Sequence, residues 1–338
     1  MSKRIICLLS VIIFVASSYA EWEPASFVDI GVGARAISLG RAFSSVVEDG
    51  SSLYWNPAGL GGIKKLELSF MGRSLMSDEW TTLKNVTPRY ECMYVVLPVS
   101  FFRLMGNSAV GIGWLRSSLG NIPYTYLDAD GYIVRDEFES LGSAFLVSWG
   151  DKVTLARREK MYFGLSLRVI SVQFSKIKDA SAVGYDIVAG IIYRLGRTNL
   201  GLAVDRGINL VWVDGYVDKG PLSVQVGISH RFLVFENIDF VPMLEILQKQ
   251  NYPIMSNLGL ESEIMLNSFL KKLFIRCGIS EFVLEDRFNY RNRMNERVNF
   301  SLGGGFKIEY EFLSLSIDYA YSVENLGNKQ RISISLFF

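Results

Sequence analysis

A strict two-residue alternation of apolar with small or polar side chains is the feature that most constrains how this chain folds. In residues 313–321 (LSLSIDYAY), every odd position is apolar and every even position is small or polar. Residues 183–193, 222–229, 298–310 and 330–338 follow the same period. A period of two places alternate side chains on opposite faces of a β-strand. The sequence therefore predicts strands with two unlike faces.

About fourteen such segments follow one another, each roughly nine to thirteen residues long, the length of a tilted strand that crosses a membrane. Their second face is largely Gly, Ser, Ala and Asn, as a crowded narrow lumen requires, whereas the wet face of a soluble sheet usually carries Lys and Glu. We predict an all-β fold, an antiparallel transmembrane β-barrel of about 14 strands. A soluble secreted β-sandwich or propeller is the alternative. The strands are expected to begin near Lys65, Tyr90, Ser108, Leu141, Met161, Val183, Leu200, Leu222, Ile238, Asn257, Leu273, Val298, Leu313 and Gln330.

The connections between these strands alternate in length, with three short exceptions near Lys178, Gln250 and Asn325. Long external loops and short periplasmic turns are typical of outer-membrane barrels. The long connections are residues 72–89, 117–138, 207–221 and 283–297, and the interleaved short ones are residues 100–107, 195–199, 232–237 and the turn at Glu311.

The first twenty residues have the features of a secretory signal peptide. Lys3 and Arg4 precede an apolar run over residues 5–15, and Ser18-Tyr19-Ala20 forms a small-x-small cleavage site. The apolar run is too short to span a membrane. We therefore expect export with cleavage near Ala20, and a mature protein in the outer membrane of a diderm bacterium.

Composition argues against several other functions. The net charge is +1 and no long charged run occurs, so no nucleic-acid partner is expected. His230 is the single histidine, and Cys-x-x-Cys pairs are absent, so we predict no catalytic residue, no metal site and no cofactor. Asp128 and Asp130 fit a turn better than a metal site. We predict that the protein is not an enzyme.

Residues 27–43, 46–49 and 54–60 (YWNPAGL) together resemble the N-terminal signature of the PorV/PorQ family, which belongs with the FadL-type fatty-acid transporters. Many members of that family have glycine where this chain has Arg41. The resemblance implies a fourteen-stranded outer-membrane barrel whose N-terminal segment folds inside as a small plug, or hatch. On this view the chain divides into a signal peptide (1–20), a hatch (21–64) and a barrel (65–338).

The hatch motif Trp55-Asn56-Pro57-Ala58-Gly59 has the chemistry of a sharp turn. Pro57 fixes its own φ and biases Asn56 away from the α region, while the Asn56 side chain can cap the turn that follows. Gly59 permits backbone shapes that other residues resist. Non-helical backbone at membrane depth survives only when it is buried in protein or faces a watery cavity. An ordinary periplasmic loop leading into the first strand is the alternative.

Two further features are open to a specific and a general interpretation. Ile332, Ile334, Leu336 and Phe338 resemble the terminal signal that the outer-membrane assembly machinery recognises, although any amphipathic last strand can show such a pattern. Three consecutive glycines, residues 303–305, either let the hatch or a ligand press against the wall or relieve crowding in a narrow barrel.

Two functions are compatible with this sequence. PorV-type relatives work with the type IX secretion system, so the first hypothesis is protein export and surface attachment, with secreted proteins bound by the external loops at residues 122–127 and 211–213. The alternative is a FadL-like transporter of hydrophobic small molecules such as fatty acids or aromatics. Either role adds outer-membrane lipid and the assembly machinery as partners.

Overall fold

The computed structural model describes residues 24–74, 87–99, 108–127, 133–177, 179–266, 269–285, 298–324 and 327–338. The expected signal peptide, residues 128–132 and most of the predicted loop at 283–297 lie outside these ranges. Within them, no helix is long and apolar enough to cross a membrane. The strands are β1 (Glu67–Ser74), β2 (Thr87–Val99), β3 (Ser108–Leu127), β4 (Ile133–Ala156), β5 (Glu159–Phe174), β6 (Ser181–Leu195), β7 (Thr198–Asp205), β8 (Asn209–Trp212), β9 (Val217–Lys219), β10 (Ser223–His230), β11 (Phe232–Phe235), β12 (Ile238–Lys249), β13 (Ile254–Met265), β14 (Leu270–Glu285), β15 (Asn299–Tyr310), β16 (Leu313–Glu324) and β17 (Gly327–Phe337).

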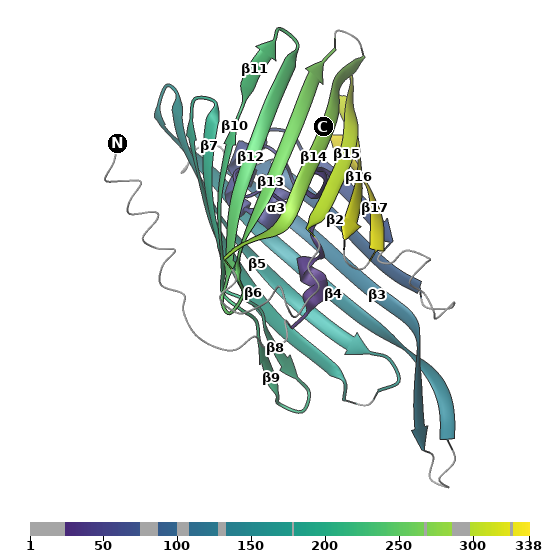
Figure 1. The fold of residues 1–338 in the computed structure, drawn as a ribbon. Helices are drawn as coiled ribbons and strands as arrows, with labels where there is room; N and C mark the ends of the chain where they lie inside the picture. The colour runs from purple at the N-terminus through teal and green to yellow at the C-terminus, as the bar shows by residue number, and fades with distance from the viewer. Residues whose placement is uncertain are drawn as a thin grey trace.

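These strands form one closed antiparallel barrel (Figure 1). Strand β1 pairs with β2 on one side and with β17 on the other, so the sheet has no open edge along its wall. Short strands β8 and β9 form a hairpin beside β6, and β11 prolongs β10 along β12. The remaining fourteen strands make the wall, which confirms the predicted fold class.

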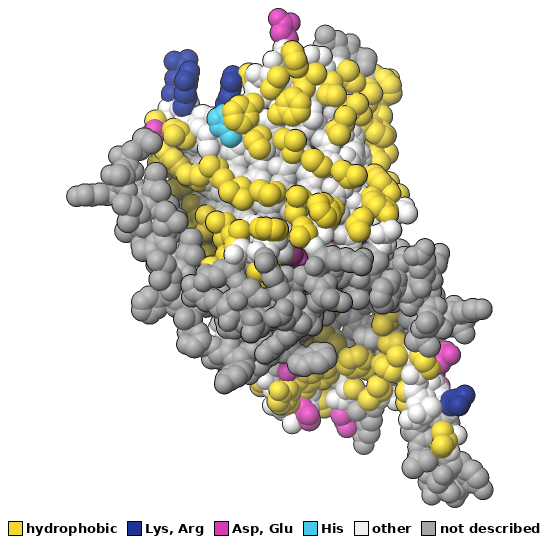
Figure 2. All heavy atoms as spheres, in the orientation of Figure 1, with side chains coloured by type: hydrophobic (Ala, Val, Ile, Leu, Met, Phe, Trp, Pro, Cys, Tyr) yellow, Lys and Arg dark blue, Asp and Glu magenta, His cyan; other side chains and the backbone are white. Residues whose placement is uncertain are grey.

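The two faces of the wall differ as the alternation predicts. In β16, Ser316 and Asp318 are buried toward the lumen, while Ile317 between them faces outward. In β17, Ser333 is buried, and Ile332 and Ile334 on either side are exposed. On the face in view, Figure 2 shows rows of apolar side chains over the visible wall, with most of the visible charged side chains near its upper edge and lower end. Such a surface is suited to lipid contact, where only a closed barrel satisfies every backbone group of a sheet.

The long-hairpin rim of the barrel is built differently from the predicted loops. Strands β3 and β4 run far beyond their neighbours as a paired ribbon, visible at the lower right of Figure 1. Residues 122–127, expected in a loop, belong to β3, and residues 211–212 belong to β8. Aromatic and β-branched residues there favour strand pairing. The turns at residues 157–158, 196–197 and 311–312 mark the opposite, short-turn rim.

Residues 24–66 precede the first strand and lie inside the barrel (Figure 1, purple). They form four short helical turns joined by irregular backbone, and most of their apolar side chains are buried in one cluster with lumen-facing wall residues. We call these residues the N-terminal segment. Its turns are η2 (Ser26–Ile30), α2 (Ala34–Ser38), α3 (Ser52–Trp55) and η3 (Pro57–Gly62).

Candidate functional site

The turn at Asn56-Pro57 lies at the centre of the N-terminal segment. Asn56 is extended, with φ −154° and ψ 101°, as expected of a residue before proline. Its side-chain oxygen accepts a hydrogen bond from the Ala58 amide at 3.1 Å and so caps η3. Its side-chain nitrogen donates to the Ser44 carbonyl at 2.6 Å and to the Leu202 carbonyl of β7 at 3.3 Å. One side chain therefore joins the turn, the rest of the segment and the wall.

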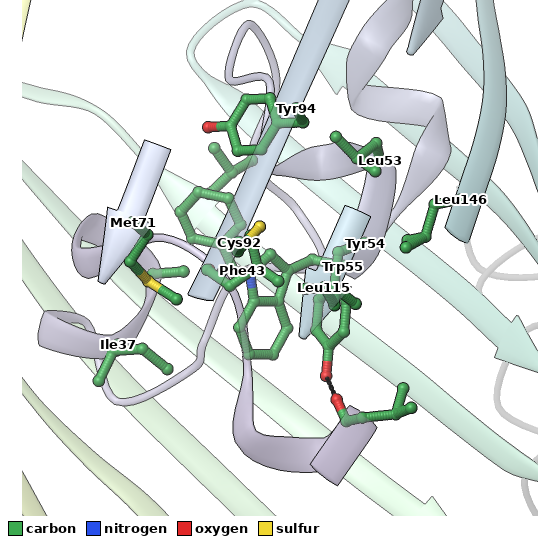
Figure 3. Packing of buried hydrophobic residues seen from close by; sticks show 14 of the residues in the cluster. Ile37, Phe43, Leu53, Tyr54, Trp55, Met71, Cys92, Tyr94, Leu115 and Leu146 are labelled. Atoms are coloured by element: carbon green, nitrogen blue, oxygen red, sulfur yellow. Dashed lines mark hydrogen bonds between the residues drawn. The ribbon is translucent and has the colours of Figure 1, made fainter. Parts of the chain in front are cut away.

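The aromatic pair before this turn fixes how the segment folds on itself. The Trp55 indole nitrogen donates to the Val32 carbonyl at 2.8 Å, and the Tyr54 hydroxyl donates to the Val28 carbonyl (Figure 3). The two rings meet edge to face, 4.9 Å between centroids. Burial, with the nearby carboxylate of Asp29, raises the pKa of the Tyr54 hydroxyl, which therefore remains a hydrogen-bond donor.

A row of wall glycines forms the seat for the turn. Gly150, Gly164 and Gly190 face one another across β4, β5 and β6. A Cβ added at Gly164 would lie 2.5 Å from the Ala58 nitrogen, and one at Gly150 would lie 2.5 Å from the Pro57 carbonyl oxygen. Ordinary contact begins at 3.4 Å. The segment thus rests directly on wall backbone that only glycine leaves accessible.

A second glycine seat lies on the other side of the lumen. Gly259 of β13 and Gly278 of β14 are cross-strand partners, and an added Cβ would lie 2.6 Å from the Leu39 carbonyl oxygen at the first and 2.7 Å from the Gly40 Cα at the second. At Gly303, it would lie 3.1 Å from the hydroxyl of Ser38. At this position the structure favours the interpretation in which the segment presses against the wall.

Buried wall carboxylates anchor the segment between the two seats. Glu245 of β12 accepts hydrogen bonds from the backbone amides of Phe43 and Ser44, at 3.2 and 2.8 Å. Its other oxygen accepts from the Asn257 side chain at 3.0 Å. Because a buried carboxylate left without donors is costly, these amides hold the segment at a defined position.

Arg35 makes the second electrostatic anchor. Its guanidinium donates to both oxygens of Glu261, at 2.9 and 2.8 Å, and to Asp49 at 2.9 Å. Glu261 also accepts from Arg276 at 2.6 Å, and Arg276 reaches Asp318 at 2.6 Å. Bidentate arginine–carboxylate pairs are strong and directional. This network therefore ties helix α2 to three wall strands.

Arg41 occupies the position where many PorV/PorQ members have glycine. Its φ of 64° lies in the left-handed region, which explains why glycine suits this position. The side chain offsets this strain through a 2.9 Å ion pair with Glu281 of β14 and a hydrogen bond to the Ile30 carbonyl. The departure from the signature thus adds a wall contact.

A cavity of about 1110 Å³ lies between the N-terminal segment and the long-hairpin rim. Its apolar lining includes Tyr54, Trp55, Leu247 and Phe282. Each charged residue of the lining is engaged within the protein. The cations Arg41, Arg168, Lys249 and Lys329 pair with Glu281, Asp205, Asp29 and Glu324, and Glu245 accepts the backbone amides described above.

Aromatic rings continue along the extended hairpins at the same rim. Tyr124 meets Phe138 edge to face at 5.7 Å, Phe138 meets Phe174 at 6.0 Å, and Phe174 stacks on Trp212 at 6.2 Å. These rings come from β3, β4, β5 and β8, so the pairing of the strands assembles them. We call this row the aromatic track.

The structure places the predicted site residues in two separate regions. Trp55, Asn56, Pro57, Ala58 and Gly59 are buried together in the lumen. The predicted assembly-signal residues belong to the last strand, β17, and its end, and β17 pairs with β1 in the wall. Ile332, Ile334 and Leu336 all face outward from β17, and the Phe338 amide donates to the Leu66 carbonyl at 3.0 Å.

Sequence reasoning identified Gly303 but missed the other wall glycines, at residues 150, 164, 190, 259 and 278, and the carboxylates Glu245 and Glu261. Their signal was present, since each lies on the small and polar face of a predicted strand. An acidic residue at such a position in a membrane strand points to a partner inside the lumen.

Several solved structures are similar to this chain, and some of them are titled as channels or transporters of aromatic hydrocarbons. CymD, a monoaromatic hydrocarbon channel, matches with a TM-score of 0.57 and 11% identity over 91% of this chain and 97% of its own. The toluene transporter TbuX of Ralstonia pickettii matches at 0.53 and 12%, over 91% and 97%. A FadL homologue of Pseudomonas aeruginosa matches at 0.52 and 13%, over 91% and 98%. At these identities the similarity shows the fold alone, a closed antiparallel β-barrel.

No protein-family model matches the chain, and no curated protein sequence is similar to it. The resemblance to the PorV/PorQ signature therefore rests on residues 27–60 alone.

Proposed function

We propose that this protein is an outer-membrane channel for uncharged, hydrophobic small molecules, with the N-terminal segment as its hatch. The observation that carries this proposal is the cavity beside the segment. Its charged residues are engaged within the protein, while Tyr54, Trp55, Leu247 and Phe282 give it apolar surface for a ligand. Burial of apolar surface in a concave site is the usual basis of small-molecule binding, and polar side chains that also line this cavity, such as Gln225 and Asn257, can orient a ligand.

The aromatic track supports the same function. Tyr124, Phe138, Phe174 and Trp212 present flat apolar surfaces at the rim from which a ligand would enter. The structural relatives are named as channels and transporters of aromatic hydrocarbons, which favours the transporter alternative over protein export. None of these observations favours export, and we propose no catalytic activity.

Passage through the lumen requires a change in the N-terminal segment. The segment contacts wall strands on both sides of the barrel through the two glycine seats, Glu245 and Glu261. The segment has a docked and a displaced position. A ligand that binds more tightly when the segment is displaced shifts the equilibrium toward the displaced position, by an amount set by the ratio of its two affinities. The proposed hatch thus opens by breaking these contacts while the wall stays closed.

Two matched substitutions test this function. Ala203 of β7 faces the cavity and is 3% exposed, whereas Ala189 of the adjacent β6 faces outward. Ala203→Trp should reduce the uptake of radiolabelled toluene by proteoliposomes, because the indole fills part of the cavity. Ala189→Trp adds the same ring to the lipid face and should leave uptake unchanged. Equal uptake by both folded variants would contradict a route through this cavity.

A further inference from the structure

Two cations face each other on the lumen side of the short-turn rim. Lys160 of β5 and Arg194 of β6 are direct cross-strand partners, on the same face as the buried Tyr162 and Ile192. Like charges directly opposite one another destabilise an antiparallel pair. Arg194 donates a hydrogen bond to the side-chain oxygen of Asn199 in β7 at 3.0 Å, but this acceptor is neutral and does not balance the charge of the pair.

Two more cations join this pair. Lys152 of β4 is the cross-strand partner of Tyr162, and Lys64 lies three residues after Gly61, which packs on the backbone of Asp151 beside Lys152. The positive charges of Lys160, Lys64 and Arg194 act on Lys152 together with the negative charge of Glu48. The Arg194 guanidinium lies over the Tyr162 ring at 5.4 Å, which directs it toward the same space. We call Lys64, Lys152, Lys160 and Arg194 the cationic cluster.

The neighbouring acids offset only part of this charge. Glu48 of the N-terminal segment pairs with Arg194 at 3.2 Å, and its side chain is 52% exposed. Glu159 is next to Lys160 in β5, so its side chain points to the opposite face of the strand. Glu48 is the one carboxylate that forms an ion pair with these four cations among the described residues. With the buried Asp151 beside Lys152 also counted, a surplus of two positive charges remains. The large cavity differs, because its charges are paired.

We propose that the cationic cluster is a binding site for a phosphate-type oxyanion. Arginine and lysine donors around one point suit a group with several anionic oxygens. The anion can be a lipid headgroup, because Val153, Leu155 and Leu195 are exposed on the outward face of the same strand ends and can contact acyl chains. It can also be a free phosphate. This site is independent of the proposed transport of uncharged molecules.

Binding can be measured on the purified full-length barrel in a zwitterionic detergent at low salt. One titration uses inorganic phosphate, followed by calorimetry, and a second uses phosphatidylglycerol with phosphatidylcholine as the zwitterionic comparison, followed by native mass spectrometry. Binding of phosphate supports a free anion as the source. Binding of phosphatidylglycerol over phosphatidylcholine without phosphate binding supports the headgroup. Binding of neither overturns the proposal.

Single substitutions locate the site. Lys160→Gln should weaken binding about tenfold, the effect of removing one cation about 5 Å from an anion in a partly solvated site. Lys271→Gln makes the same change at an exposed position of β14 on the same rim and should have no effect. Glu48→Gln should strengthen binding, because it removes the carboxylate that competes for Arg194. Equal affinity in Lys160→Gln and Lys271→Gln, with both variants folded by heat-modifiable gel migration, would overturn the assignment.

Discussion

The glycine seat under Asn56-Pro57 makes the hatch proposal testable with a single methyl group. In Gly164→Ala, the new Cβ would lie 2.5 Å from the Ala58 nitrogen and closer still to the Pro57 carbonyl carbon, so the turn must move by about 1 Å to reach the 3.4 Å of ordinary contact. The hydrogen bond from Asn56 to Leu202 is already 3.3 Å long, and a shift of that size breaks it.

The expected cost follows from these two effects. Overpacking a well-filled site costs about 1–3 kcal/mol. Loss of one hydrogen bond adds about 1 kcal/mol. The docked state of the segment should therefore lose about 2–4 kcal/mol, which raises the displaced population roughly 30- to 700-fold at 1.4 kcal/mol per tenfold change.

Single-channel conductance in planar bilayers measures that population as the fraction of time spent open. Gly72→Ala is the matched control, because Gly72 is also a strand glycine but an added Cβ there has its nearest neighbour at 3.7 Å. Deleting residues 26–61 should leave a folded wall that conducts steadily. Gly164→Ala, made in that deletion variant, should not raise the conductance further. A folded Gly164→Ala variant that conducts no more than Gly72→Ala would refute the reasoning.

Two further predictions concern the wall and its assembly. Ile317→Arg should lower the free energy of unfolding, measured with urea in liposomes, by about 2–4 kcal/mol, because it places a charge on the lipid face near the midplane. Ser316→Arg, on the lumen face, should lower it clearly less. Equal losses of unfolding free energy in the two variants would contradict the placement of Ile317 on the lipid face and Ser316 on the lumen face. Replacing Phe338 with Asp should leave export intact but lower the yield of membrane-inserted, heat-modifiable protein; an unchanged yield would mean that the terminal pattern is incidental.

The two faces of the wall strands could be predicted because they depend on residues that are adjacent in the sequence. Alternating side chains fix the two faces of a strand before any partner is chosen, since successive Cβ atoms point in opposite directions. This is why the outward position of Ile317 and the lumen position of Ser316 could be read directly. Cys277, on the apolar face of β14, is exposed, and Cys92 is buried and free.

The ends of the strands could not be predicted in the same way. Residues 122–127 and 133–138 contain turn-compatible residues such as Pro123, and they become strands because each supplies the partner of the other. Pairing between two segments depends on their joint geometry, which neither segment contains alone.

The sequence by itself determined the class of fold, the two faces of the wall and the local turn at Asn56-Pro57, because each depends on neighbours a few residues apart. Only the tertiary structure decided what the turn touches. Gly164 seats Pro57, and Glu245 holds Ser44 across 201 residues of chain, because closure of the barrel brings β5 and β12 around one lumen. The antiparallel register of β5 and β6 places Lys160 opposite Arg194. The physical reason is that contacts and charge balance depend on distance in space, and the antiparallel register sets that distance.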